Sequence, residues 1–107
     1  MQSLRVGNPL DKNTDIGAIN SKEQLDKITS LVNEGVEDGG ELFQTQCELP
    51  GNGFWFRPSL FTNVQPSYSI AREEIFGPVL TTLTFRTPEE AVEIANNTEY
   101  GLSAGVW

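Results

Sequence analysis

Apolar side chains recur at spacings of three and four along residues 25–36, with charged and polar side chains between them. The positions that form this stripe are Leu25, Ile28, Leu31, Val32 and Val36. This period predicts an amphipathic helix. Ser21 is placed to be its N-cap, with Gln24 three residues later as the capping-box partner, and Gly39-Gly40 is a natural stop. We therefore predict a helix over residues 21–38.

The last third of the chain carries a second helix start. Thr87 is a capping residue, Pro88 suits the first helical position, and two acidic residues follow in the first turn. This helix is predicted to end between residues 96 and 101. Residues 79–85 before it and 102–107 after it have the β-branched and apolar content of strands. A strand–helix–strand unit of this kind requires a right-handed crossover and parallel pairing.

Two shorter strands are predicted between the helices. Residues 42–44 form one, and the aromatic-rich run 54–61 forms the other, with Pro58 marking an edge or a break. Loops rich in turn-forming residues are predicted at residues 7–20, 46–53 and 65–77. The last of these loops is expected to hold one helical turn near residues 71–74. The predicted fold class is α/β, a mainly parallel sheet with flanking helices, in one unit over residues 1–107.

Composition excludes several classes of function. The chain has 107 residues and a net charge of −8, without a basic patch, which argues against nucleic acid and anionic membrane surfaces as partners. No apolar run is long enough to span a membrane, and the N-terminus lacks the apolar core of a signal peptide. There is no histidine and only one cysteine, so a zinc site, a Ser-His-Asp triad and an internal disulfide are excluded within these residues.

Four segments carry recognisable motifs, and they occur in one order. They are Arg5–Asp11, Gly53–Phe61, Glu73–Val79 and Ala95–Ala104. The third, Glu-Glu-Ile-Phe-Gly-Pro-Val, resembles the Glu-x-Phe-Gly-Pro motif of NAD(P)-dependent aldehyde dehydrogenases, and the fourth resembles their Ala-Asn-x-x-x-Tyr-Gly-Leu-x-Ala segment. The first resembles the stretch after that family's catalytic helix, and the second resembles its Gly-[Tyr/Phe]-x-x-x-Pro-[Thr/Ser]-x-[Phe/Leu] strand. The likeness runs from about Leu4 to Trp107, and four ordered motifs together are specific.

The resemblance implies that five residues bind NAD or NADP. Glu74 matches the glutamate that hydrogen-bonds the nicotinamide-side ribose, a role that suits an ionised carboxylate because it accepts from two vicinal hydroxyls. Phe76 matches the aromatic residue near the nicotinamide end, and Leu102 matches an apolar residue of the nicotinamide pocket. Gln24 and Lys27 lie one turn apart on the helix whose family counterpart reaches the adenosine-side ribose.

Most of these residues also have a purely structural interpretation. Glu74 fits a solvated turn, and Phe76 fits core packing, which does not exclude a role at the cofactor. Gln24 fits the capping box alone, and Lys27 fits an exposed helix lysine. The sequence leaves these alternatives open.

Cys47 is not expected to be the nucleophile, although Thr45-Gln46-Cys47 faintly resembles the residues around the family's catalytic cysteine. The family's cysteine precedes the Val-Gly-Asn-Pro segment, whereas Cys47 follows it. No His, Lys or helix N-terminus adjoins Cys47 to favour its thiolate. The family's general-base glutamate and Gly-rich cofactor turn are also absent from these residues. We therefore predict no catalytic residue and no metal ligand among these residues.

We therefore expect the chain to be a portion of an aldehyde dehydrogenase catalytic domain, since a predicted strand is cut at Trp107. The order of the motifs places this portion after the catalytic cysteine. The whole enzyme would oxidise an aldehyde to a carboxylic acid through a cysteine adduct and hydride transfer to NAD(P), whereas this chain alone would be inactive. The alternative is a non-catalytic aldehyde dehydrogenase-like module kept for protein–protein contacts. A small acidic binding protein, complete in itself, explains the ordered motifs least well.

The expected partners and location follow from the same interpretation. The aldehyde and the dinucleotide are partners of the whole enzyme. The chain itself is expected to form a homo-oligomer or to self-associate, because removing neighbouring segments exposes apolar surface and sheet edges. An intracellular location is expected, with the cytoplasm favoured and the mitochondrion left open.

Overall fold

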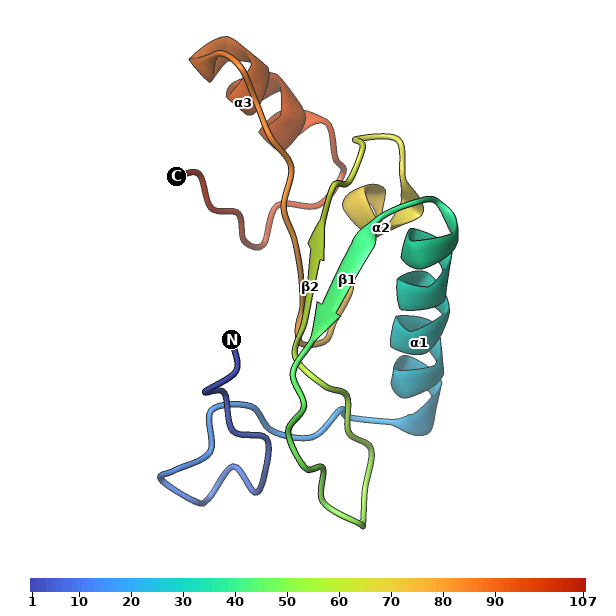
Figure 1. Ribbon diagram of the computed structural model, residues 1–107, viewed down its shortest axis with the longest axis vertical. Coiled ribbons are helices and arrows are strands. Elements are labelled where there is room, and N and C mark those ends of the chain that lie inside the picture. The colour runs from blue at the N-terminus through green and yellow to red at the C-terminus, as the bar shows by residue number, and fades with distance from the viewer.

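The computed structural model describes residues 1–107, which form three helices and three short strands (Figure 1). In chain order these are α1 (Lys22–Glu37), β1 (Glu41–Gln44), β2 (Ser59–Thr62), α2 (Ser69–Arg72), β3 (Val79–Thr81) and α3 (Pro88–Asn96). The strands form one sheet in the order β1-β2-β3. β1 pairs antiparallel with β2, and β2 pairs parallel with β3. The α/β class is as predicted, but the sheet is mixed rather than mainly parallel.

Helix α1 begins and ends within one residue of the predicted bounds. The Ser21 side chain accepts a hydrogen bond from the Gln24 backbone N–H at 3.1 Å, which caps the helix. At the other end, Gly39 has a φ of 110°, a left-handed conformation that glycine adopts without steric cost. The reciprocal half of the capping box is absent, because the Gln24 side chain donates to the carbonyl of Phe76 instead.

The hydrophobic core lies between α1, α2 and one face of the sheet (Figure 1). It consists of Ile19, Ile28, Val32, Phe61, Val64 and Ile70. The ring of Phe61 points from β2 toward α1 and is fully buried. Gly40 makes room for that ring, since a Cβ at this position would lie 2.9 Å from Phe61 Cδ1.

The predicted strands differ from the observed ones where no neighbouring strand is present to pair with them. The strand predicted over residues 54–61 forms only at Ser59–Thr62, and the strand predicted over 79–85 forms only at Val79–Thr81. Residues 102–107 form no strand and are exposed. A strand is stable only when it hydrogen-bonds to a neighbouring strand. Helix α3 lies beyond the end of the sheet (Figure 1), and the residues that follow it do not pair with β3. The predicted strand–helix–strand unit is therefore wrong in its last element.

The two remaining helices lie close to their predicted positions. The helical turn predicted near residues 71–74 is observed as α2, two residues earlier. In α3, Thr87 caps the helix by accepting a hydrogen bond from the Glu90 N–H at 3.2 Å, with Pro88 at the first helical position. No helix in the chain combines the length and the apolar character needed to cross a membrane.

The face of the sheet away from α1 is apolar and open. Phe43, Leu60 and Leu80 are partners in register across the three strands, so their side chains share one face. Phe43 and Leu80 remain 57% and 61% exposed. Because side chains alternate along a strand, this row lies on the face opposite to Phe61. Self-association of the chain through this row remains a prediction.

Replacing Leu80 by serine is expected to weaken self-association of the 107-residue chain by about tenfold or more. Full burial of a leucine side chain contributes about 1.5–3 kcal/mol, and the serine would lose that contribution. Sedimentation velocity over a range of concentrations measures the effect. Val92→Ser is the matched control, since Val92 is equally exposed (61%) but lies on α3. A wild-type chain that stays monomeric throughout, or equal effects of the two changes, would contradict the prediction.

Candidate functional site

Within the segment Glu73–Pro78, Phe76 and Gly77 lie on the first half of α1, and Glu73 lies near its C-terminal end. A Cβ at Gly77 would lie 2.5 Å from Ile28 Cδ1, so only glycine permits this close approach without a shift. Gln24 Nε2 donates to the Phe76 carbonyl oxygen at 3.4 Å, a long hydrogen bond near the outer limit. On the other side, the Ser59 N–H donates to the Pro78 carbonyl oxygen at 2.8 Å and connects the segment to the sheet. The segment is thus held from both α1 and β2.

Gln24 and Phe76 are brought together by this arrangement, although they stand far apart in the sequence. The Phe76 side chain is 61% exposed, so it does not belong to the core and is free to contact a ligand. Lys27 is exposed one turn after Gln24 and forms neither a hydrogen bond nor an ion pair within the chain. Both predicted adenosine-side residues therefore lie on α1 near the Glu-Glu-Ile-Phe-Gly-Pro segment.

The two neighbouring glutamates of this segment differ in their surroundings. Glu73 is exposed, and its Oε2 accepts a hydrogen bond from the Tyr100 hydroxyl at 3.4 Å. Glu74 is half-buried, and its carboxylate accepts no hydrogen bond from the chain. An ionised carboxylate only accepts hydrogen bonds and has room for several donors. Both oxygens of Glu74 therefore remain available to hydroxyl groups of a ligand.

A cavity of about 600 Å³ adjoins Glu74. Leu102 and Tyr100 line it together with Glu74, as do apolar residues of β3 and α3. Two of the five predicted residues thus meet at this cavity. Gln24, Lys27 and Phe76 do not line it, so the predicted residues form two groups, joined through the segment that carries both Glu74 and Phe76.

A second cavity, of about 750 Å³, contains none of the predicted residues. Its lining is entirely polar and includes five carboxylates, those of Glu34, Glu37, Asp38, Glu73 and Glu99, with Arg72 as the one cation. Such a lining repels the diphosphate of a dinucleotide. Glu74 and Leu102, two of the residues predicted to face the cofactor, line the smaller cavity instead. The chain also holds no group of three or more His, Cys, Asp or Glu residues that is suited to a metal ion.

Tyr100 joins the site without having been predicted. The negative charge of Glu73 raises the pKa of the Tyr100 hydroxyl above its ordinary value, with smaller contributions from desolvation and from Glu99 and Glu74. The signal in the sequence was present, because Tyr100 is the tyrosine of the Tyr-Gly-Leu motif that also supplies Leu102. Only the fold brings this tyrosine to Glu73.

The raised pKa of Tyr100 predicts an alkaline titration that Glu73 controls. Because the pKa of Tyr100 is higher in the folded chain than in the unfolded chain, its protonated hydroxyl contributes to stability below pH about 10. This contribution is lost as the pH rises from there through the folded-state pKa. In Tyr68→Phe, Tyr100 is the only tyrosine, so tyrosinate absorbance reports on it alone. Glu73→Gln is expected to lower the pKa of Tyr100 toward its ordinary value, with Glu89→Gln as a control. An unchanged titration midpoint in Glu73→Gln would contradict the assigned cause.

Comparisons with known proteins identify the family of the chain. The sequence matches the model of the aldehyde dehydrogenase family over residues 1–107. It is 43% identical over 106 residues to a curated Staphylococcus aureus protein named after this family, which covers 96% of this chain. The crystal structure of an NAD-dependent aldehyde dehydrogenase from Sinorhizobium meliloti superposes with a TM-score of 0.85 at 49% identity, over 97% of this chain.

Two further solved structures contain ligands. Aldehyde dehydrogenase C from Pseudomonas syringae, in complex with NAD+ and octanal, is 40% identical with a TM-score of 0.82, over 94% of this chain. A 3,6-anhydro-L-galactose dehydrogenase in complex with NAP is 36% identical with a TM-score of 0.84, also over 94%. The chain belongs to the aldehyde dehydrogenase family. It spans 22% of the length of the Staphylococcus relative and 21% of the Sinorhizobium structure.

Proposed function

We propose that residues 1–107 supply the ribose-binding and nicotinamide-facing part of an NAD(P)-dependent aldehyde dehydrogenase. The longer enzyme oxidises an aldehyde to a carboxylic acid. Within it, Glu74 binds the nicotinamide-side ribose, while Phe76 and Leu102 pack near the nicotinamide ring. Gln24 and Lys27 reach the adenosine-side ribose. The dinucleotide, when bound, accepts the hydride that leaves the substrate.

The observation that carries this proposal is the free carboxylate of Glu74 at a cavity. It lies beside Leu102 and makes no hydrogen bond within the chain. Burial of an unpaired carboxylate is unfavourable, and half-burial next to an open cavity fits a group whose partners come from a ligand. Two vicinal ribose hydroxyls would each donate to one of its oxygens, which fixes the sugar and the ring attached to it.

The contact between α1 and the motif supports the same proposal. Gln24 donates to the Phe76 carbonyl, and Gly77 sits directly on Ile28. These contacts fix the backbone on both sides of Phe76 while leaving its ring exposed. Because the backbone is already fixed, only the Phe76 side chain would lose conformational entropy when it packs against a ligand. Lys27, one turn along α1, offers a cation to the same side of the molecule.

A chimera tests the proposal, in which residues 1–107 replace the matching segment of the Sinorhizobium meliloti dehydrogenase. The chimera is expected to bind NAD+ by calorimetric titration and to oxidise aldehyde, because the host would supply the missing nucleophile. The isolated chain is expected to show no turnover. Turnover by the isolated chain that survives Cys47→Ala, or a folded chimera without affinity for the dinucleotide, would overturn the proposal. The second of these outcomes is the one that a non-catalytic, contact-making module predicts.

A further inference from the structure

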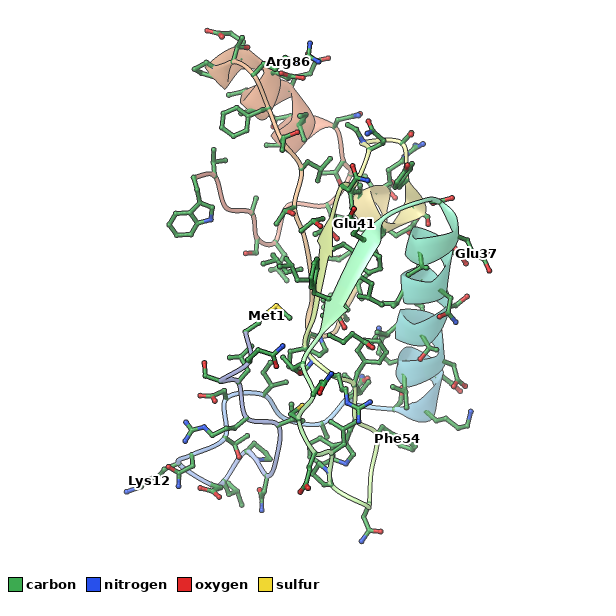
Figure 2. The ribbon with its side chains drawn as sticks, viewed as in Figure 1. Met1, Lys12, Glu37, Glu41, Phe54 and Arg86 are labelled. Carbon is green, nitrogen blue, oxygen red and sulfur yellow. The ribbon has the colours of Figure 1, made fainter.

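The loop between β1 and β2 carries the dipeptide Asn52-Gly53 at the end of the molecule away from α3 (Figure 1). Figure 2 shows the adjoining Phe54 near this end and Arg86 near the opposite one. Asn52 and the glycines on both sides of it are exposed. A Cβ added at Gly51 would meet nothing within 4 Å, so this part of the loop faces open solvent.

The two groups of this dipeptide that could react with each other are both free. The Asn52 side-chain amide makes no hydrogen bond within the chain, and neither does the Gly53 backbone N–H. Gly53 adopts a φ of 97°, a conformation in which other residues are strained, and it has no Cβ to shield its nitrogen. Attack by this nitrogen on the neighbouring side chain is therefore not obstructed.

A hydrogen bond to the same peptide group favours that attack. The Trp55 indole Nε1–H donates to the Asn52 carbonyl oxygen at 2.6 Å. The bond draws electron density from the peptide between Asn52 and Gly53, since hydrogen-bonded groups polarise one another. The Gly53 N–H is therefore easier to deprotonate than that of a peptide without such a donor.

We propose that Asn52 is a site of spontaneous deamidation, one form of the lability of asparagine. The deprotonated Gly53 nitrogen attacks Asn52 Cγ and forms the new C–N bond of a cyclic imide. The Cγ–Nδ2 bond breaks, and ammonia leaves after taking up a proton. Water then opens either C–N bond of the imide, which gives aspartate or isoaspartate. The net change consumes one water and releases one ammonia, without an oxidant or a reductant.

The two products affect the loop differently. Both make the net charge one unit more negative than −8. Aspartate keeps the backbone and the Asn52 carbonyl that accepts from Trp55. In isoaspartate the chain runs through Cγ instead, and that carbonyl becomes part of a free carboxylate. The isoaspartate product therefore moves the acceptor of the Trp55 indole and lengthens the loop backbone.

Peptide mapping of the full 107-residue chain, after incubation at mildly alkaline pH, tests the proposal. Asn20 and Asn97 are internal controls, since both are exposed but precede Ser21 and Thr98. Asn52 is expected to deamidate about tenfold faster than either, a ratio that corresponds to a barrier lower by about 1.4 kcal/mol. Equal or slower loss at Asn52 would overturn the proposal.

A second measurement assigns the product to this position. Protein isoaspartyl methyltransferase with a labelled methyl donor reports isoaspartate in the intact chain. Asn52→Gln is expected to reduce methyl acceptance of the aged chain to that of the fresh chain, because the longer side chain would need a larger ring to cyclise. Undiminished methyl acceptance in aged Asn52→Gln would place the reaction elsewhere and contradict the proposal.

Discussion

Glu74→Gln is expected to weaken NAD+ binding by the chimera about 10- to 100-fold. A hydrogen bond to a charged group contributes about 1.5–3 kcal/mol, and the amide retains the shape of the side chain without its charge. The amide also replaces one acceptor oxygen by a donor, which cannot pair with a ribose hydroxyl in the same way. Isothermal calorimetry with NAD+ measures the dissociation constant directly.

Glu73→Gln is the matched control for this change. The two residues are adjacent and chemically identical, but Glu73 already accepts from Tyr100, whereas Glu74 has no partner in the chain. We expect Glu73→Gln to alter the dissociation constant by less than about threefold, the range of an exposed charge. Equal losses in the two variants would indicate a general effect of charge and contradict a specific ribose contact at Glu74.

Gly77→Ala is expected to lower the free energy of unfolding of the chain by about 1–3 kcal/mol, the usual effect of overpacking a core. The added Cβ would lie 2.5 Å from Ile28 Cδ1 and 3.1 Å from Ile28 Cγ1. The Ile28 side chain is fully buried, so it has little room to move away. Either Ile28 leaves its preferred rotamer or the motif segment moves off α1. Urea unfolding followed by circular dichroism measures the change.

A double-mutant cycle separates this contact from other effects of removing a glycine. Ile28→Val deletes the Cδ1 atom that the new methyl group would strike, so it should recover part of the stability lost in Gly77→Ala. Gly51→Ala is the control, because a Cβ there meets nothing within 4 Å. Additive effects of the Gly77 and Ile28 changes, or an equal loss in Gly51→Ala, would contradict the proposed clash.

The helices were predictable from the sequence because their signals are local. The apolar stripe and Ser21 defined α1, and Thr87 with Pro88 defined the start of α3. Each of these signals acts within a few residues of the backbone that it orders. The predicted bounds of α1 therefore differ from the observed ones by a single residue at each end.

The strands were less predictable because pairing joins distant residues. Fourteen residues separate β1 from β2, so the sequence contains no tight-turn signal that predicts their antiparallel pairing. Apolar content alone also predicted a strand over residues 102–107, where no partner strand is present. Composition indicates which residues favour a strand, but a neighbouring ladder decides whether the strand forms.

The residues of the site were predictable where the signal is local and not where distant segments meet. The motif itself placed Glu74 and Phe76 within two residues of each other. Nothing in the sequence indicates that the Gln24 side chain donates to the Phe76 carbonyl rather than to its expected cap, or that Tyr100 reaches Glu73. These contacts depend on how the segment Glu73–Pro78 lies on α1. That placement depends in turn on the absence of a side chain at Gly77.

A comparison of NAD+ with ADP as ligands of the chimera and its Glu74→Gln variant tests the ribose contact of Glu74 most directly. ADP keeps the adenosine-side ribose and the diphosphate but lacks the nicotinamide-side ribose. We expect Glu74→Gln to weaken NAD+ binding about 10- to 100-fold and to leave the dissociation constant of ADP unchanged. Equal weakening for both ligands, or no weakening for NAD+, would contradict the assignment of Glu74 to the nicotinamide-side ribose.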